Sequence, residues 1–137
     1  MSNRSRGAAF EVRIKKYLES LGFTVDKARA ALHFRGPGKF FSSQNDFFGC
    51  ADLIAIHPEK PYVLFIQATL GEISSRKKKL LAVPWNLQVC RVQLWKRDES
   101  FRGGIVVKEL GREGSWREII FRIKDGESCL ALEPISG

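Results

Sequence analysis

A carboxylate and a pair of polar side chains lie on two apolar segments that follow each other closely in the chain. Asp52 begins the segment 52–56, and Gln67 and Thr69 end the segment 62–69. Both segments are typical of strands, whose side chains alternate between the two faces with period two. Gln67 and Thr69 are therefore expected on one face, and a hairpin between the segments would bring Asp52 beside them. Oxygen-bearing side chains grouped in this way are able to hold a hard divalent cation, which polarises a phosphodiester for hydrolysis.

Each of these three residues also has a purely structural interpretation. Asp52 stands among small and apolar neighbours, where a buried carboxylate is costly unless it is paired or binds a metal. An aspartate at the start of a strand can instead bond the local backbone. The Gln67 amide oxygen is a candidate cation ligand, together with the backbone carbonyl of Ala68, or the amide is a hydrogen-bonded core group. Thr69 is an ordinary strand residue, and the residue types leave both interpretations open.

Two further carboxylates in the first half of the chain are candidates for the same site. Glu11 follows the apolar Phe10 in an expected helix, and its alternative role is an ion pair with Lys15 one turn later. Asp46 precedes the segment 47–49 and is either another ligand or a turn former. Acidic residues are scarce in the first 70 positions, which narrows the search for ligands to a few carboxylates.

The composition is that of a folded protein of one domain. The chain has 137 residues and a hydrophobic fraction of 44%, which suffices for a core without staples. We expect a single domain over 1–137, with a core over about 4–97 and a C-terminal hairpin and tail over 101–137. The three cysteines are widely spaced and include no CxxC pair, so neither a disulfide framework nor a zinc site is expected.

The positive charge is concentrated in the N-terminal third of the chain. The net charge is +8, and residues 1–45 contain nine Lys and Arg against three Asp and Glu, with a further basic run at 76–79. Such clustering is typical of proteins that bind a polyanion such as nucleic acid, and its alternative is a solvated surface. Trp85, Trp95 and Trp116 are able to stack on bases, although packing in a core or an interface is the commoner role.

The sequence also bears on where the protein works. No apolar run reaches the roughly 18 residues that are needed to span a membrane. Residues 1–7 are basic and polar and are not followed by the apolar stretch of a secretory signal. We therefore expect a cytoplasmic protein that does not associate with a membrane.

Helices and strands are expected to alternate along most of the chain. The pattern predicts a helix over 7–21, a strand over 23–30, a loop over 33–45, strands over 52–56 and 62–69, a helix from 74 or 75 to about 82, a strand over 88–95, and a hairpin of 104–110 with 116–123. This order favours an α/β fold with a central mixed sheet flanked by helices.

Four segments in this order resemble the PD-(D/E)XK nuclease superfamily and, within it, the archaeal-type Holliday-junction resolvases. Residues 6–11 resemble the basic N-terminus and first helix, whose glutamate supports the metal site. Residues 29–43 resemble the mobile basic strand and loop ahead of the site, and residues 51–55 the strand with the metal-binding aspartate. Residues 65–69 align with the (D/E)XK strand. The resemblance covers about residues 4–95 and implies a restriction-endonuclease-like core.

The sequence departs from the superfamily pattern at three positions. Ala51 replaces the usual proline, Gln67 replaces the acid, and Thr69 replaces the lysine, so that QxT stands for (D/E)xK. The loss of the acid predicts weaker metal binding, which Glu11 or Asp46 is expected to restore. The loss of the lysine predicts that another cation takes over its role, and the candidates are Lys77, Lys78, Lys79 and Arg29.

The resemblance implies a Mg²⁺-dependent endodeoxyribonuclease, with Mn²⁺ as a substitute, that cuts four-way DNA junctions as a homodimer in recombination and repair. The alternatives are a binding module that holds branched or duplex DNA at a dead site, and a nuclease of restriction or flap type. The implied catalytic residues are Glu11, Asp52, Gln67, Thr69 and Lys77, and the implied metal ligands are Asp52, Gln67, Ala68, Glu11 and Asp46. The implied DNA contacts are Arg4, Arg6, Arg13, Arg29, Arg35, Lys39, Ser43 and Lys78.

Overall fold

A computed structural model of the chain describes most of its backbone and about two thirds of its side chains. The described residues are 3–34, 37–38, 40–44, 46–98, 104–124 and 127–135, and the described side chains are those of 6–29, 37–38, 46–98 and 104–120. The elements are α1 (Asn3–Ser20), β1 (Thr24–Lys27), β2 (Ala30–Phe34), β3 (Phe40–Gln44), β4 (Leu53–Ile56), β5 (Val63–Thr69), α2 (Ser74–Leu81), β6 (Cys90–Asp98), β7 (Gly104–Leu110), the 3-10 turn η1 (Arg112–Gly114), β8 (Trp116–Lys124) and β9 (Glu127–Ile135).

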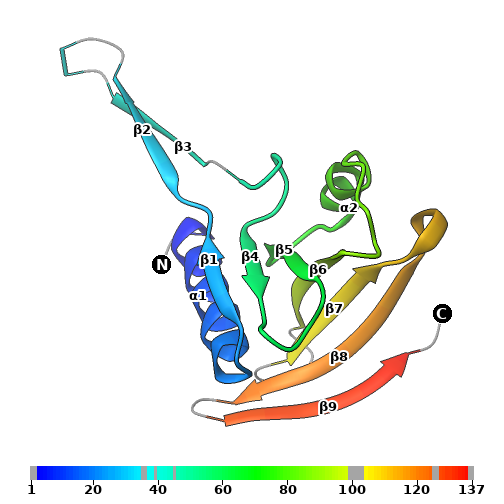
Figure 1. Cartoon of the computed structure of the whole chain (residues 1–137). Coiled ribbons are helices and arrows are strands. Elements are labelled where there is room, and N and C mark those ends of the chain that lie inside the picture. Colours follow the sequence, from blue (N-terminus) through cyan, green and yellow to red (C-terminus); the bar gives the residue numbers. More distant parts are fainter. Residues whose placement is uncertain are drawn as a thin grey trace.

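A seven-stranded sheet forms the centre of the molecule, as Figure 1 shows. Its strand order is β1-β4-β5-β6-β7-β8-β9, and the pair β5–β6 is parallel while every other pair is antiparallel. The parallel pair needs a crossover, because a tight turn cannot join parallel strands. The helix α2 lies in that crossover. The prediction of an α/β fold with a mixed sheet and flanking helices is confirmed at this level.

The helix α1 covers one face of the sheet. Phe10, Ile14, Tyr17 and Leu18 recur at helical spacing and are all buried. They pack with apolar side chains of the strands β1, β4, β5 and β7 in one core cluster. The helix is followed by Gly22, whose φ of +96° is a backbone conformation that favours glycine.

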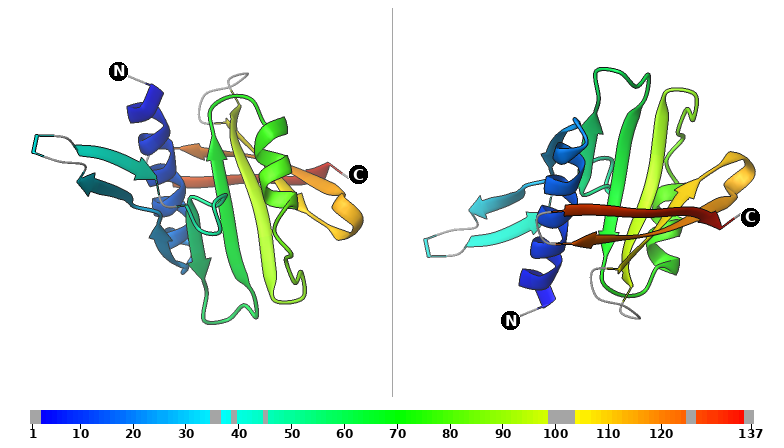
Figure 2. Two further views of the ribbon diagram at one scale, coloured as in Figure 1. Left: turned by 90° about the horizontal axis from the view of Figure 1, so that it is seen from above. Right: turned by 90° about the horizontal axis from the view of Figure 1, so that it is seen from below.

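The helix α2 covers the opposite face. Leu80, at 0% exposed, packs with Val92 and Leu94 of β6 in a second core cluster. The two views in Figure 2 show α2 on one side of the central strands and α1 on the other. In the described part of the chain, no helix is long and apolar enough to cross a membrane.

Two predictions about the less regular segments are wrong. Residues 33–45 were expected to form a loop, but β2 and β3 pair as an antiparallel ribbon that projects from the body in Figure 1. Pro37 and Gly38 lie in the turn between these strands, and Gly38 has φ +71°, so the glycine-rich signal marked a hairpin turn. The expected C-terminal tail instead contains β9, which pairs with β8 and extends the sheet.

The other elements differ from the predictions mainly at their ends. The helix α1 begins at Asn3 rather than at residue 7, the strand expected over 23–30 ends at Lys27, and β6 begins at Cys90 rather than at residue 88. The expected hairpin of 104–110 with 116–123 is confirmed. It belongs to the main sheet, because β7 pairs with β6, and Ile105 and Val107 pack in the same cluster as α1.

Candidate active site

The pairing of β4 with β5 places Asp52 beside Gln67. Leu53 pairs with Ile66 in an antiparallel register, and the Asp52 backbone N–H donates to the Ile66 carbonyl oxygen at 2.7 Å. The next residue on each side is then Asp52 opposite Gln67, on one face of the sheet. The expectation that a hairpin brings these two residues together is confirmed.

The Asp52 carboxylate is held by two hydrogen bonds to a single oxygen. Its Oδ2 accepts one bond from Gln67 Nε2 at 2.8 Å and another from the Ala68 backbone N–H at 2.8 Å. The Asp52 side chain is 6% exposed and Gln67 is 3% exposed. Because both bonds are made to Oδ2, the carboxylate is fixed in orientation while Oδ1 remains for a ligand.

Burial raises the pKa of the Asp52 carboxyl to about 7. The negative charges of Glu11 and Asp46 raise this pKa further, whereas the Ala68 N–H bond and the positive charge of Arg76 lower it. The charged form of Asp52 therefore lacks a full set of partners among the described residues. A cation beside the carboxylate would supply what is missing.

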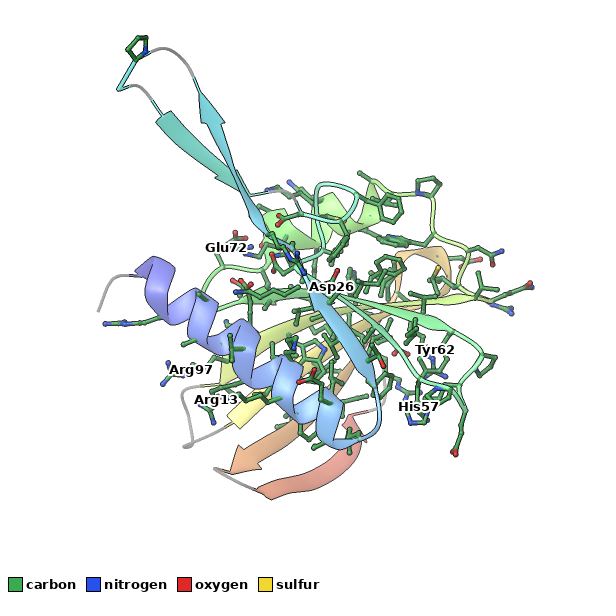
Figure 3. The ribbon with its side chains drawn as sticks, turned by 60° about the vertical axis from the view of Figure 1, so that its left-hand side comes forward. Arg13, Asp26, His57, Tyr62, Glu72 and Arg97 are labelled. Atoms are coloured by element: carbon green, nitrogen blue, oxygen red, sulfur yellow. The ribbon has the colours of Figure 1, made fainter. Side chains whose placement is uncertain are left out.

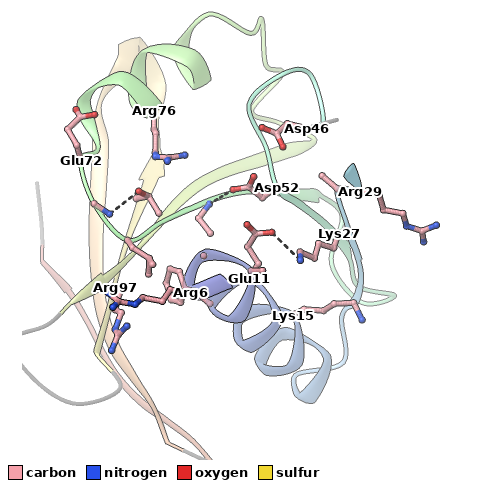
Figure 4. A pocket seen from close by; sticks show the side chains of 18 of the residues that line it. Arg6, Glu11, Lys15, Lys27, Arg29, Asp46, Asp52, Glu72, Arg76 and Arg97 are labelled. Atoms are coloured by element: carbon pink, nitrogen blue, oxygen red, sulfur yellow. Dashed lines mark hydrogen bonds and ion pairs between the residues drawn. The ribbon is translucent and has the colours of Figure 1, made fainter. Parts of the chain in front are cut away.

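Asp52 lies in a pocket of about 1190 Å³ between the first half of α1, the end of β1 and the start of α2. Figure 4 shows Glu11, Asp46 and Asp52 around this pocket, with cationic side chains at its edges. The cations that line it are Arg6, Lys15, Lys27, Arg29, Arg76 and Arg97. The carboxylates that line it are Glu11, Asp26, Asp46, Asp52 and Glu72, so acidic and basic side chains share the pocket.

Glu11 faces this pocket from α1. Its carboxylate lies 3.6 Å from the Lys27 Nζ, and its side chain is 16% exposed. Burial is the largest influence on the Glu11 carboxyl and raises its pKa, while Lys27 lowers it. The alternative of an ion pair with Lys15 is wrong, because Lys15 pairs with Glu19 at 3.0 Å.

Asp46 contributes a carboxylate oxygen without a partner. The turn that follows it is closed by a bridge between Phe47 and Ala51. Asp46 Oδ1 is buried and accepts no hydrogen bond from the described residues, which is costly for a polar atom. Among these residues no three His, Cys, Asp or Glu side chains are grouped closely enough to form a metal site on their own.

Gln67 and Thr69 differ in how they meet the pocket. Thr69 lines it, and the Thr69 Oγ1 accepts a bond from the Gly71 backbone N–H at 3.1 Å. Gln67 does not line it, because the amide Nε2 is directed at Asp52 and at the Ala68 carbonyl oxygen, 3.3 Å away. The Gln67 amide thus orients Asp52 and presents nitrogen, not oxygen, toward it.

Arg76, and not the expected Lys77, is the cation of α2 that lines the pocket and acts electrostatically on Asp52. The Lys77 Nζ lies 5.3 Å from the centroid of the Trp116 ring, and Lys77 is not among the residues that line the pocket. Arg76 lines the pocket and acts electrostatically on Asp52 and on Glu11. The sequence analysis did not identify Arg76, although helical spacing contained the signal.

That signal is the position of Arg76 one turn before a core residue. Arg76 precedes the fully buried Leu80 by four residues, so both face the sheet. Lys77 precedes Leu81, which is 46% exposed, by the same interval. Arg76, which shares a face of α2 with the buried Leu80, is therefore the cation of this run that reaches the pocket.

The other expected DNA contacts are spread over several elements. Arg6 and Arg29 line the pocket, and Lys78 is exposed on α2. Figure 3 shows Arg13 on α1, outside the residues that line the pocket. Arg97 is an additional lining cation that the sequence analysis did not identify. Four expected contacts lie outside what the structure describes: Arg35 and Lys39 as whole residues, and Arg4 and Ser43 in their side chains.

The chain was compared with known proteins in three ways. No protein-family model matches it, and no match was found among curated proteins or among solved structures.

Proposed function

We propose that this protein is a metal-dependent endodeoxyribonuclease whose active site is centred on Asp52. The observation that carries the proposal is a buried carboxylate with a pKa of about 7, grouped with Glu11 and Asp46 in a pocket edged by cations. Perturbed carboxyls in a cleft are typical of functional sites. The hairpin β4–β5 followed by α2 and β6 supports a restriction-endonuclease-like core.

The oxygen atoms of the pocket fit a hard divalent cation. Mg²⁺ usually takes one or two carboxylates and keeps several waters, so it does not need a closed group of three acidic ligands. Asp52 would be the central ligand, with the Ala68 carbonyl and either Asp46 or Glu11 beside it. The unpartnered Oδ1 of Asp46 is an available acceptor. When bound, Mg²⁺ or Mn²⁺ would polarise the phosphate and lower the pKa of a bound water.

The side chains around the ion would have separate roles in binding and catalysis. Gln67 orients Asp52 through the bond at 2.8 Å. The Arg76 guanidinium is placed to stabilise negative charge that develops on the phosphate, which is the part that the motif lysine would otherwise take. The remaining lining cations neutralise phosphates on either side of the cut, a contact that carries no base specificity.

The proposed substrate is branched DNA, and in particular the four-way junction. The six cations that line the pocket and the basic N-terminal third of the chain support recognition of the DNA backbone. Two strands of a junction must be cut, and a homodimer would supply two sites related by symmetry. A nuclease of restriction or flap type would use the same pocket on other DNA.

A DNA-binding module without activity is the second candidate. It is favoured by the Gln67 amide, which donates to Asp52 where an acid would ligate metal, and by the uncharged Thr69. This candidate predicts the same DNA contacts as the nuclease and no turnover.

A cleavage assay on three DNA substrates separates these proposals. A four-way junction, a linear duplex and a flap would be incubated with Mg²⁺, with Mn²⁺ or with EDTA. The nuclease predicts cutting with either metal and none with EDTA, and the resolvase predicts cutting of the junction above all. Tight binding without cutting under every condition would establish the binding module, and equal cutting of duplex and junction would contradict the resolvase.

A further inference from the structure

Phe48 is an aromatic side chain that is exposed beside the candidate site. It is 68% exposed, the largest value among the exposed large apolar residues of the described chain. Its φ is +54°, a left-handed conformation that is unfavourable for a bulky residue. A strained backbone that presents an aromatic ring to solvent calls for a binding partner of this ring.

Two other aromatic rings support Phe48 from below. Its ring centroid lies 5.7 Å from that of Phe65 and 5.7 Å from that of Trp85, with an angle of 89° between the Phe48 and Trp85 planes. Phe65 and Trp85 are 4.8 Å apart, and Trp85 Nε1 donates to the Leu80 carbonyl oxygen at 2.7 Å. Phe48 therefore packs on two aromatic side chains, Phe65 and Trp85, that are themselves held in place.

Phe48 and the aromatic side chains beneath it lie close to the pocket. Asp46, two residues earlier in the same turn, lines the pocket. Phe65 and Thr69 lie on one face of β5 and are separated by four residues, which is about 13 Å along a strand. Thr69 also lines the pocket. This length corresponds to about four nucleotides of a stacked strand, each rising about 3.4 Å.

Charge near the turn suits a phosphate backbone. Cys50, two residues after Phe48, packs in the same core cluster as Leu80 of α2, the residue that follows Lys79. Lys79 is exposed on α2. An aromatic face with a neighbouring cation is the arrangement that binds a nucleotide by stacking on its base and pairing with its phosphate.

We propose that Phe48 stacks on an unpaired nucleobase of the DNA strand that leaves the pocket along the α2 face. The inference rests on the proposed nuclease function and specifies its substrate as DNA with an unstacked base near the cut. A protein partner is a poorer match, because a stable interface needs about 800 Å² on each side and Phe48 is a single exposed ring on its support.

The test uses a four-way DNA junction that carries one unpaired 2-aminopurine, placed at successive positions near the branch point, in EDTA. Stacking on a ring quenches this fluorophore, so the wild-type protein should quench it at one position or at a short run of positions. Phe48→Leu, which keeps an apolar side chain, should lose the quenching and bind about five- to a hundredfold more weakly. Phe48→Tyr should retain both.

Controls separate a local effect from misfolding. Ile56→Ala removes another exposed apolar side chain, 53% exposed on β4, and should leave quenching and affinity unchanged. Equal quenching by wild type and Phe48→Leu, or no quenched position in a bound junction, overturns the inference alone. If the wild-type protein neither binds nor cuts the junction, the proposed function fails as well. A change in the molecular mass of the assembly with unaltered quenching would assign Phe48 to a contact between copies.

Discussion

The two faces of the β4–β5 hairpin differ in chemistry at the end of the strands where Asp52 lies. Under α1 the side chains are apolar: Leu53, Ala55, Leu64 and Ile66 are at most 3% exposed. On the face toward α2, toward the end of the same strands, Asp52, Gln67 and Thr69 are 6%, 3% and 4% exposed and polar. Burial alone thus does not distinguish a core from a site. The distinction is whether the buried groups are satisfied without a ligand.

Asp52 is the buried group whose negative charge the surrounding protein does not fully compensate. Two hydrogen bonds reach it, yet burial and two neighbouring carboxylates still raise its pKa to about 7. A face selected for stability alone would hold apolar residues here, because polar groups are costly to bury. Local choices that conflict with stability are expected at functional sites. The following variants test this contrast between the two faces.

The largest effect is expected for Asp52→Asn. The amide keeps the size of the side chain and removes the anionic ligand, so we expect cleavage in Mg²⁺ to fall by about 10³-fold, since metal polarisation is worth several kcal/mol. Junction affinity in EDTA should be retained. Single-turnover cleavage and a gel-shift titration measure the two quantities. Glu59→Gln makes the same chemical change at an exposed carboxylate in the turn between β4 and β5 and is the matched control; equal losses in both variants would contradict the assignment.

The pH dependence of stability tests the same carboxyl without any substrate. Its pKa is about 7 in the folded protein and about 3.8 unfolded, so the folded state holds the proton more tightly. The stabilisation that this bound proton gives the folded state is complete below about pH 4 and is lost as the pH rises through 7. The free energy of unfolding falls by up to about 4 kcal/mol over this range. Asp52→Asn should lack this loss, so the difference in unfolding free energy between the two proteins should change between pH 4.5 and pH 8 in EDTA. Urea titrations measure it, and a difference that is independent of pH would show that Asp52 titrates normally.

On the apolar face, Ile66→Ala should lower stability without affecting the chemistry. Ile66 is 0% exposed and packs against α1. Truncation of such a side chain costs about 3 kcal/mol of unfolding free energy. Cleavage per folded molecule should stay unchanged at a temperature well below the transition. If Ile66→Ala instead reduced turnover as strongly as Asp52→Asn does, the two faces would not be separable.

The regular part of the fold was accessible from the sequence because local pattern determines it. The helical spacing of Phe10, Ile14 and Leu18 and the alternation in the strand segments indicated α1 and the main strands correctly. The ribbon β2–β3 and the strand β9 were not predicted. Their strands are defined by pairing with each other or with β8, and such pairing is a tertiary property that periodicity alone does not carry.

The candidate site was predictable to the extent that strand register determines it. Alternation placed Asp52 near Gln67 correctly, because side chains opposite each other in an antiparallel pair share a face. The direction of the Gln67 amide and the partner of Glu11 depend on neighbours remote in sequence, Asp52 and Lys27. The choice of Arg76 among four consecutive cations needed the helix phase, which the buried Leu80 fixes.

The smallest of these effects is expected for Arg76→Gln, and it tests which residue replaces the motif lysine. Arg76 lines the pocket and Lys77 lies against Trp116. Loss of one charge that stabilises the transition state should slow cleavage by about 10- to 100-fold at saturating DNA. It should also raise the pKa of Asp52, because Arg76 lowers that pKa, so the pH at which cleavage in Mg²⁺ reaches half its plateau should increase.

Two charge-matched variants separate this role from a general loss of positive charge. Lys77→Gln changes the next residue of the helix. Lys60→Gln changes an exposed lysine in the turn between β4 and β5. Figure 3 labels His57 and Tyr62, which stand at the two ends of this turn. Both variants should cleave at the wild-type rate and keep its pH midpoint. If Lys77→Gln slowed cleavage and Arg76→Gln did not, Lys77 would be the replacement for the lysine. A shift of the pH midpoint in Arg76→Gln alone would link the cation on α2 to the buried carboxyl on the polar face, a coupling that a merely structural arginine would not produce.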